Sequence, residues 1–399
     1  MKDIRERFIE VPGTSEDEQD FGSISQSELL GVAVATTDWT TETLLNQLHK
    51  GNIQLNPRFQ RRDAWELKRK SQFIESLILG LPVPQIVLAE RPQQKGTYIV
   101  LDGKQRLLCL RQFTAASNDP DYTSFKLDGL VVRTDLNGKS LDDLNTDFHF
   151  RKDVTALDNY GIRAVVLRNW KTEKLLGHIF LRLNMGSKPL SPQELRQALH
   201  PGPFLDFADE ASTKSTAIRD ILGNDSPDFR MRDVELLIRY LSFKHLLNFY
   251  RGNLKEFLDE ACAQFNRDWS FLNRDLKNDI SELDANVQII HQAFGSNYNF
   301  GKWVGGRFET RFNRAVFDIL VQALAVPGVS NAVRQAPEKM ADAFKQLCST
   351  DNQFLDAIER TTKSIEATRY RFTAWYKALS EAFGLGLPDP SVGTSTPKS

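Results

Sequence analysis

The chain has 399 residues, of which 41% are hydrophobic and 26% are charged, the balance of a globular protein with two or three domains of about 150 residues each. The formal net charge is only −1, which excludes a global basic excess, so any nucleic-acid surface must be a local patch. No apolar run approaches the roughly 20 residues of a membrane helix, and the charged start of the chain has no apolar signal core, so we expect a cytoplasmic protein without a membrane span.

The N-terminal part of the chain predicts a mixed domain that follows a mobile arm. Residues 1–35 are polar and acidic and lack sustained periodicity, which indicates an arm. Over residues 36–170 short apolar runs alternate with helical patterns, which is typical of an α+β (mixed α/β) domain. Helices are predicted over 41–50, 65–79 and 104–113, and strands over 85–89, 98–101 and 161–167.

The rest of the chain predicts an all-α region over residues 171–385. Its clearest start signal is Ser191-Pro-Gln-Glu194, a capping box with proline at the first helical position. The tail over 386–399 is rich in Pro, Ser and Thr, and we expect it to be disordered. Further helices are predicted over 233–247, 254–265, 272–294, 310–325, 331–347 and 363–383.

The strongest chemical motif is Asp102-Gly103-Lys104-Gln105-Arg106, where an apolar strand passes through a glycine directly into a helix. The first N–H groups of a helix lack partners and attract anions, and glycine lets the backbone approach a ligand. Arg106 can hold a phosphate through two hydrogen bonds, Lys104 adds a cation, and Asp102 can bind Mg²⁺. The alternative is an ordinary strand-to-helix turn with Asp102 as the cap and Arg106 in solvent. The spacing excludes a P-loop.

The second motif, which runs from Gln54 to Arg62, interleaves cations with an aromatic ring. Its arginines suit phosphate contacts, and Phe59 suits base stacking. The alternative is a solvated loop whose arginines pair with Asp63 and Glu66. The candidate residues for contact with DNA or a nucleotide are Arg58, Phe59, Gln60, Arg61 and Arg62.

Two weaker motifs lie further along the chain. The loop from Asn184 to Lys188, before the capped helix, offers N–H groups and a cation to a phosphate, or it is a plain turn between helices. Arg230 and Arg232 precede a predicted helix, for which Asp233 is the natural cap. They either face DNA or form structural salt bridges, and the second reading is favoured.

Cysteine and histidine residues do not form a recognisable metal site. The three cysteines are far apart and odd in number, which gives neither a disulfide framework nor a Cys-x-x-Cys pair. The six histidines are scattered, and no His-Asn-His cluster occurs in the C-terminal region. We therefore expect a reducing compartment, no structural zinc and no self-contained nuclease centre.

The order of these segments resembles the ParB/sulfiredoxin-like superfamily. Within it, the five residues from Asp102 to Arg106 closely resemble the Asp-Gly-Gln-Gln-Arg box of the GmrSD-type restriction endonuclease N-terminal family. The resemblance covers about residues 39–258. It is carried by Asn56-Pro-x-x-Gln60-Arg61, the helix at 74–80, Leu81-Pro-Val-Pro84, Gly103-x-x-Arg106, Arg182-Leu-Asn184-x-Gly186, Ser191-Pro-Gln-Glu-Leu-Arg196, Asp233-x-Glu235 and Gly252-x-x-x-x-Phe257-Leu258.

The resemblance implies a prokaryotic anti-phage or restriction protein whose box binds and hydrolyses a nucleotide and so gates action on foreign or modified DNA. Carried over, Asp102, Gly103, Gln105 and Arg106 form the nucleotide site, which Gln60 and Arg61 border. Two departures matter. Lys104 replaces the first glutamine of the box, which bears on nucleotide choice or on the hydrolytic step. The family's C-terminal His-Asn-His nuclease domain is not found, which leaves either a separate nuclease subunit or a purely sensing role.

The leading hypothesis is an Mg²⁺-dependent NTPase that senses or regulates action on DNA, with the nucleotide base unspecified. In it Asp102, Gln105 and Arg106 are catalytic and Asp102 is the metal ligand. The alternatives are a non-catalytic nucleotide-gated DNA-binding module and a partner-recruiting scaffold that has lost its ligand. Long amphipathic helices such as 272–294 predict a homo-oligomer.

Overall fold

The computed structural model describes residues 30–53, 55, 63–183, 191–223, 227–228, 230–359 and 364–394. These residues form two compact units. The first, here called the α/β unit, ends at Leu199. The second, the helical unit, begins at His200 and takes the rest of the chain except residues 229–231, which group with the α/β unit. The expected domain boundary at 170 falls inside the α/β unit.

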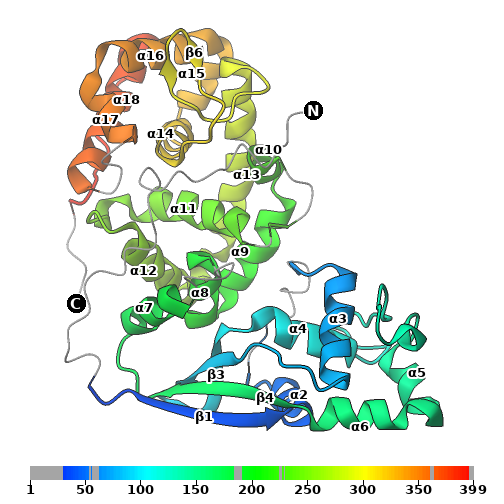
Figure 1. The fold of residues 1–399 in the computed structure, drawn as a ribbon. Helices are drawn as coiled ribbons and strands as arrows, with labels where there is room; N and C mark the ends of the chain where they lie inside the picture. Colours follow the sequence, from blue (N-terminus) through cyan, green and yellow to red (C-terminus); the bar gives the residue numbers. More distant parts are fainter. Residues whose placement is uncertain are drawn as a thin grey trace. The chain divides into compact units, whose positions relative to one another are not determined.

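The α/β unit is built on a four-stranded mixed sheet with the order β1-β4-β2-β3 (Figure 1). β1 and β4 are antiparallel, β2 and β3 are antiparallel, and β2 and β4 are parallel. A parallel pair needs a long crossover, which here runs through the helices between β3 and β4. β1 begins inside the segment that was predicted to be an arm. The prediction missed this start because the sequence around residues 33–35 carries no sign of the pairing with β4. The strands are β1 (Ala33–Thr40), β2 (Ile86–Arg91), β3 (Gln94–Asp102) and β4 (Gly161–Arg168).

Both faces of the central strands are buried, because alternate residues enter two different cores. Ile86, Leu88 and Val100 pack in a core with α2, α3, α4 and α6, whereas Val87 and Leu101 pack in a core with α7 and α8. This explains why β2 reads as a continuous apolar run rather than as an alternating pattern. The helices of the unit are α2 (Thr41–His49), α3 (Leu67–Ile78), α4 (Lys104–Phe113), α5 (Leu141–Thr146), α6 (Arg151–Asn159), α7 (Glu173–Leu183) and α8 (Pro192–Leu199).

The helical unit contains a short hairpin among its helices. The predicted helix over 331–347 is wrong as a single element: the structure ends α15 before Pro337 and begins α16 at that proline, whose missing N–H is tolerated only in a first turn. The elements are α9 (Pro203–Lys214), α10 (Thr216–Leu222), α11 (Arg232–Leu246), α12 (Leu254–Arg267), α13 (Trp269–Phe294), β5 (Trp303–Val304), β6 (Arg307–Phe308), α14 (Arg314–Leu324), α15 (Val329–Gln335), α16 (Pro337–Thr350), α17 (Asn352–Glu359) and α18 (Ile365–Phe383).

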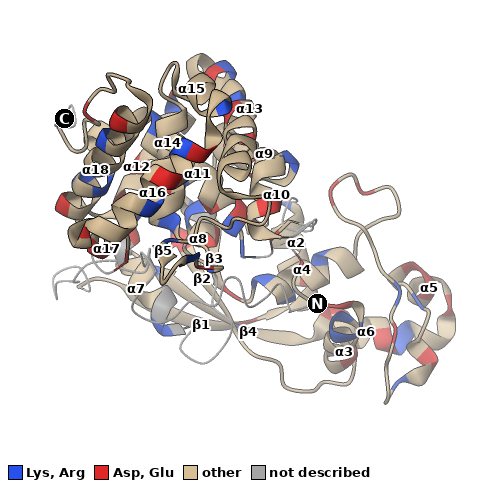
Figure 2. Cartoon of the chain, turned by 90° about the horizontal axis from the view of Figure 1, so that it is seen from above, with Lys and Arg blue, Asp and Glu red and all other residues tan. Residues whose placement is uncertain are grey.

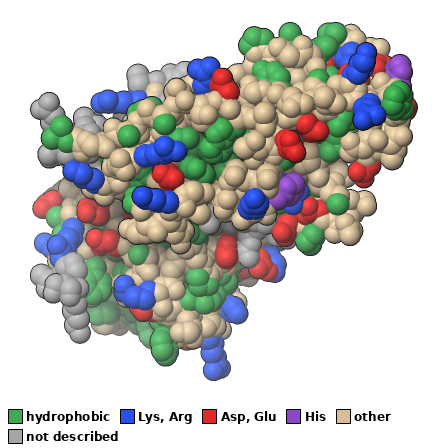
Figure 3. All heavy atoms as spheres, turned by 90° about the horizontal axis from the view of Figure 1, so that it is seen from below, with side chains coloured by type: hydrophobic (Ala, Val, Ile, Leu, Met, Phe, Trp, Pro, Cys, Tyr) green, Lys and Arg blue, Asp and Glu red, His purple; other side chains and the backbone are tan. Residues whose placement is uncertain are grey.

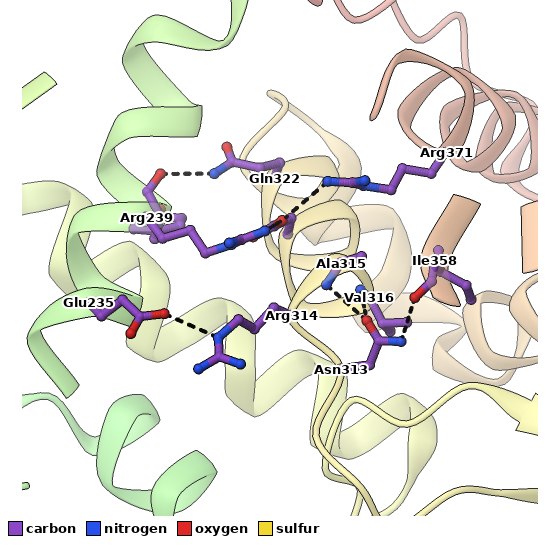
Figure 4. A network of polar contacts seen from close by, with 11 residues as sticks. Glu235, Arg239, Asn313, Arg314, Ala315, Val316, Gln322, Ile358 and Arg371 are labelled. Atoms are coloured by element: carbon purple, nitrogen blue, oxygen red, sulfur yellow. Dashed lines mark hydrogen bonds and ion pairs between the residues drawn. The ribbon is translucent and has the colours of Figure 1, made fainter. Parts of the chain in front are cut away.

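A charged network lies in the core of the helical unit around α14 (Figure 4). Arg239 Nε of α11 donates to Asp318 Oδ1 at 2.6 Å, and Arg371 Nη2 of α18 lies 3.8 Å from Asp318 Oδ2. All three side chains are fully buried. Arg314 at the start of α14 pairs with Glu235 at 3.1 Å. Because buried charges are tolerated only when they are paired, this network ties α11 and α18 to α14.

Charged residues of both signs are interspersed along the helices (Figure 2) and over the face seen in Figure 3. In the described ranges no single helix has the length and apolarity to cross a bilayer. α14 and α15 pass such a test only as a pair bent by 98°.

Candidate functional site

The box from Asp102 to Arg106 lies where β3 ends and α4 begins, as the sequence predicts. Gly103 is the N-cap of α4 and has a φ of 95°, in the left-handed region that favours glycine. A Cβ at this position would lie 2.6 Å from Ile86 Cγ2, far inside van der Waals contact. Only glycine therefore fits between the end of β3 and the start of β2.

The first turn of α4 leaves backbone donors unused. Gly103 has no side chain that can cap the helix, and within the described part of the chain the N–H groups of Gln105 and Arg106 have no hydrogen-bond acceptor. Unpaired N–H groups and the positive end of the helix dipole together favour an anion at this place. The turn therefore has the local geometry of a phosphate site.

Arg106 is held in a fixed position beside this turn. Its Nη2 donates to the backbone oxygen of Gln85 at 2.8 Å and to Asp102 Oδ2 at 3.0 Å. The side chain is 13% exposed, and its Nε is buried without a hydrogen-bond partner among the described residues. The guanidinium is therefore fixed through Nη2, while its buried Nε–H keeps an unused hydrogen-bonding capacity among the described residues.

Asp102 and Gln105 flank Arg106. The Asp102 side chain is 37% exposed, which leaves its carboxylate open to solvent beside the pair with Arg106. Gln105 Oε1 accepts a long hydrogen bond of 3.4 Å from the backbone N–H of Ala64. This contact brings the segment that begins at Asp63 to the first turn of α4. Asp102, Gly103, Gln105 and Arg106 lie together at this turn, and their role in nucleotide binding stays a prediction.

Lys104 faces away from solvent. Its Nζ lies 2.6 Å from Glu194 Oε1, and the two side chains are 6% and 7% exposed. Glu194 also closes the predicted capping box, because its Oε2 accepts from the backbone N–H of Ser191 at 2.7 Å. Sequence reasoning identified Glu194 as a helix-start residue and missed its contact with Lys104. The only available signal was that a cation at a helix N-terminus needs an anionic partner.

The remaining predicted residues fall into two groups. Arg232 belongs to the helical unit and is the first residue of α11. Its Nε donates to Asp228 Oδ2 at 3.0 Å. Arg230, two positions earlier, is half-buried. α11 begins at Arg232, so Asp233 lies in its first turn and is not the cap. Seven predicted residues lie outside the described residues: Arg58, Phe59, Gln60, Arg61, Arg62, Asn184 and Lys188.

The described residues do not gather into a metal site made of protein ligands alone. Over the described ranges, no group of three or more His, Cys, Asp or Glu side chains could hold a metal ion. Mg²⁺ in nucleotide sites needs only one or two carboxylates, because phosphates and water complete its coordination. The exposed carboxylate of Asp102, next to the turn at Gly103, fits this requirement.

Comparison with known families places the box in a recognised domain. Residues 41–201 match the family model described as the N-terminal domain of GmrSD restriction endonuclease. The matched range runs from the start of α2 to just beyond α8, so it includes the box and the contacts that Arg106, Gln105 and Lys104 make. No curated protein and no solved structure matches the chain.

Proposed function

Because residues 41–201 belong to the GmrSD restriction endonuclease N-terminal family, we propose that this chain binds and hydrolyses a nucleoside triphosphate and thereby regulates action on foreign or modified DNA. The family domain itself indicates a role in restriction or anti-phage defence. Nucleotide chemistry is the finer part of the proposal, and it rests on the geometry of the box.

The proposed nucleotide binding is supported by the geometry of the turn at Gly103. Gly103 presents a side-chain-free turn beside the unused N–H groups of Gln105 and Arg106, and the Arg106 guanidinium lies next to it with an unused Nε. A phosphate bound there would accept hydrogen bonds from the backbone and the guanidinium. Arg106 would also stabilise charge that develops on the transferred phosphoryl group.

Asp102 is the residue that would hold Mg²⁺. A bound Mg²⁺ would neutralise phosphate charge, which is its usual contribution to phosphoryl transfer. The Asp102 carboxylate already orients Arg106 through the 3.0 Å contact, so the same side chain couples the guanidinium to the metal position. Gln105, whose side chain reaches the Ala64 backbone, lies in the first turn of α4 and would orient water.

The proposal extends to fold family and partners. A mixed sheet whose strand passes through Gly103 into a helix supports a ParB/sulfiredoxin-like domain. DNA is the proposed partner, since a restriction-family domain fits DNA interaction in general. We assign DNA cleavage to a separate nuclease subunit and DNA contact to the predicted arginines. We further propose that the protein acts in the cytoplasm and that the chain self-associates.

The test compares phosphate release by the wild type with release by Asp102→Asn. ATP, GTP, CTP and UTP are each supplied with Mg²⁺, with and without DNA. Asp121→Asn, an exposed carboxylate that follows α4, is the matched control. We expect turnover of at least one nucleotide by the wild type and the control, and its loss in Asp102→Asn. No turnover by the wild type under any condition contradicts the hydrolytic function.

A second function, nucleotide-gated DNA binding without turnover, is favoured by the pairing of Asp102 with Arg106. A carboxylate that is already engaged by a guanidinium has a weakened attraction for a metal ion. Calorimetry that shows nucleotide binding by a wild type without phosphate release would select this function. The absence of all nucleotide binding would contradict both functions and leave a partner-recruiting scaffold.

A further inference from the structure

The buried ion pair between Lys104 and Glu194 joins the first turns of two helices, α4 and α8. The residues are 90 positions apart in the chain, yet Lys104 Nζ and Glu194 Oε1 are 2.6 Å apart. Both side chains are more than nine-tenths buried. A charged pair is buried at a considerable desolvation cost, so its position beside the proposed phosphate site calls for a role.

Glu194 is a rigid anchor for this pair. Its Oε2 accepts from the backbone N–H of Ser191 at 2.7 Å, and its own N–H donates to Ser191 Oγ at 3.1 Å. The next residue, Leu195, packs with Leu101 of β3 in the second core of the α/β unit. The carboxylate is therefore fixed to α8, and α8 is fixed to the strand that leads into the box.

Lys104 needs this anchor for electrostatic reasons. As the first residue of α4 it places a cation at the positive end of the helix dipole, which is unfavourable without an anion. Glu194 supplies that anion from the side of α8. The Lys104 ammonium is thereby withdrawn from the solvent from which a phosphate would approach the turn.

We infer that Lys104 is a positioning residue, not a phosphate ligand. Through Glu194 it fastens the first turn of α4, so that the N–H groups of Gln105 and Arg106 meet the phosphates at a fixed place. This inference rests on the proposed nucleotide site and replaces the expectation that Lys104 contacts the nucleotide.

The two roles of Lys104 predict opposite effects of Glu194→Gln. If Lys104 were a phosphate ligand, removing the Glu194 charge would release its ammonium, and nucleotide binding would be unchanged or tighter. If Lys104 positions the turn, Glu194→Gln and Lys104→Gln must weaken binding alike. Losses that arise from one shared contact are also not additive in the double variant.

The experiment is a double-variant cycle on the full chain. Calorimetry measures the Kd for each of ATP, GTP, CTP and UTP with Mg²⁺. We expect Lys104→Gln and Glu194→Gln each to weaken binding about tenfold, as loss of supporting contacts commonly does. The variant that carries both changes should bind no worse than either one, and Lys104→Arg should retain binding.

Arg111→Gln is the matched control. Arg111 lies on the same helix, and its Nη2 contacts Asp119 Oδ2 at the same distance of 2.6 Å, with side chains 12% and 10% exposed. Loss of this pair lowers stability without touching the first turn. We therefore expect a lower melting temperature and an unchanged Kd, which separates positioning from general destabilisation.

Amide hydrogen exchange provides a readout that needs no nucleotide. We expect Glu194→Gln to speed exchange of the Leu107 amide, which donates to Gly103 O at 3.0 Å in the first turn of α4, and Arg111→Gln to leave that amide unchanged. Unchanged exchange in Glu194→Gln, or a Kd that rises in Lys104→Gln alone, overturns the inference. If the wild type binds no nucleotide but the two variants show the expected exchange difference, the proposed function is contradicted. The inference that the Lys104–Glu194 pair fastens the first turn of α4 then still holds.

Discussion

Gly103 lies so close to Ile86 that a methyl group at Gly103 would be 2.6 Å from Ile86 Cγ2. The contact joins the end of β3 to the start of β2. Arg106 is anchored at the same two places, by Asp102 at the end of β3 and by Gln85 just before β2. The close approach and the φ of 95° both require glycine, so the turn that carries the unused N–H groups is built for backbone recognition.

Gly103→Ala should therefore destabilise the protein and weaken nucleotide binding. The left-handed backbone alone costs a non-glycine residue about 1–2 kcal/mol, and forced overpacking adds about 1–3 kcal/mol. Gly96→Ala is the control, because Gly96 also has a positive φ, of 83°, but has no atom within 4 Å of its Cβ position. Urea unfolding of both variants should show the larger loss for Gly103→Ala. Equal losses would mean that the contact with Ile86 is easily relieved.

Arg106→Lys should weaken nucleotide binding by about 10- to 100-fold, because hydrogen bonds to charged groups contribute about 1.5–3 kcal/mol. Lysine keeps the charge but cannot reach the Gln85 carbonyl and Asp102 together while also donating to a phosphate. Calorimetric Kd values would measure the loss. Arg163→Lys, at an exposed arginine paired with Asp38, should leave the Kd unchanged. A retained Kd in Arg106→Lys would show that charge alone suffices.

Asp318→Asn should destabilise the helical unit by about 3–5 kcal/mol, because it leaves two buried guanidinium groups without their carboxylate. Asp342→Asn removes an exposed pair with Lys345 and should cause no measurable change. Denaturant unfolding followed by circular dichroism reports mainly on helices and would measure the difference. Similar midpoints for the two variants would contradict a structural role for the network in Figure 4.

The carboxylate of Asp279 on α13 should make stability depend on acid pH. Burial raises the pKa of Asp279, but the hydrogen bonds and positive charges of His245 and Lys244 together lower it by more. The pKa of Asp279 in the folded protein therefore lies below the usual 3.8. A lowered folded-state pKa stabilises the protein above the unfolded value, and this stabilisation is lost as the pH falls through the folded value.

Asp279→Asn should therefore be less stable than the wild type at neutral pH, and the difference should shrink as the pH falls below 3.8. Urea midpoints measured across this range would test it. Asp275→Asn, an exposed position on the same helix, should follow the wild type throughout. A difference that stays constant with pH would mean that the asparagine acts through packing and not through its missing charge.

The local elements of the site could be predicted from the sequence. The helix expected over 104–113 is confirmed as α4, and the strands before it are confirmed with shifted ends. A run of apolar residues, a glycine and a helical period all lie within about fifteen residues, so they specify the strand, the turn and the helix without outside partners. The role of Asp102, Gln105 and Arg106 in nucleotide chemistry stays a prediction.

The partners of these residues were decided by tertiary structure. Lys104 and Glu194 are 90 positions apart, and nothing near either residue in the sequence identifies the other as its partner. The first three residues of β1, Ala33 to Ala35, could not be distinguished from an arm, because these residues acquire strand structure only by pairing with β4.

The sequence by itself therefore determined where the turn and the helix of the box lie, since backbone geometry there follows from neighbouring residues. Only the folded chain decided that Arg106 is anchored by Gln85 and that Lys104 is withdrawn into an ion pair. The physical reason is that hydrogen bonds and ion pairs between distant segments form only after packing has closed the long loops that separate them.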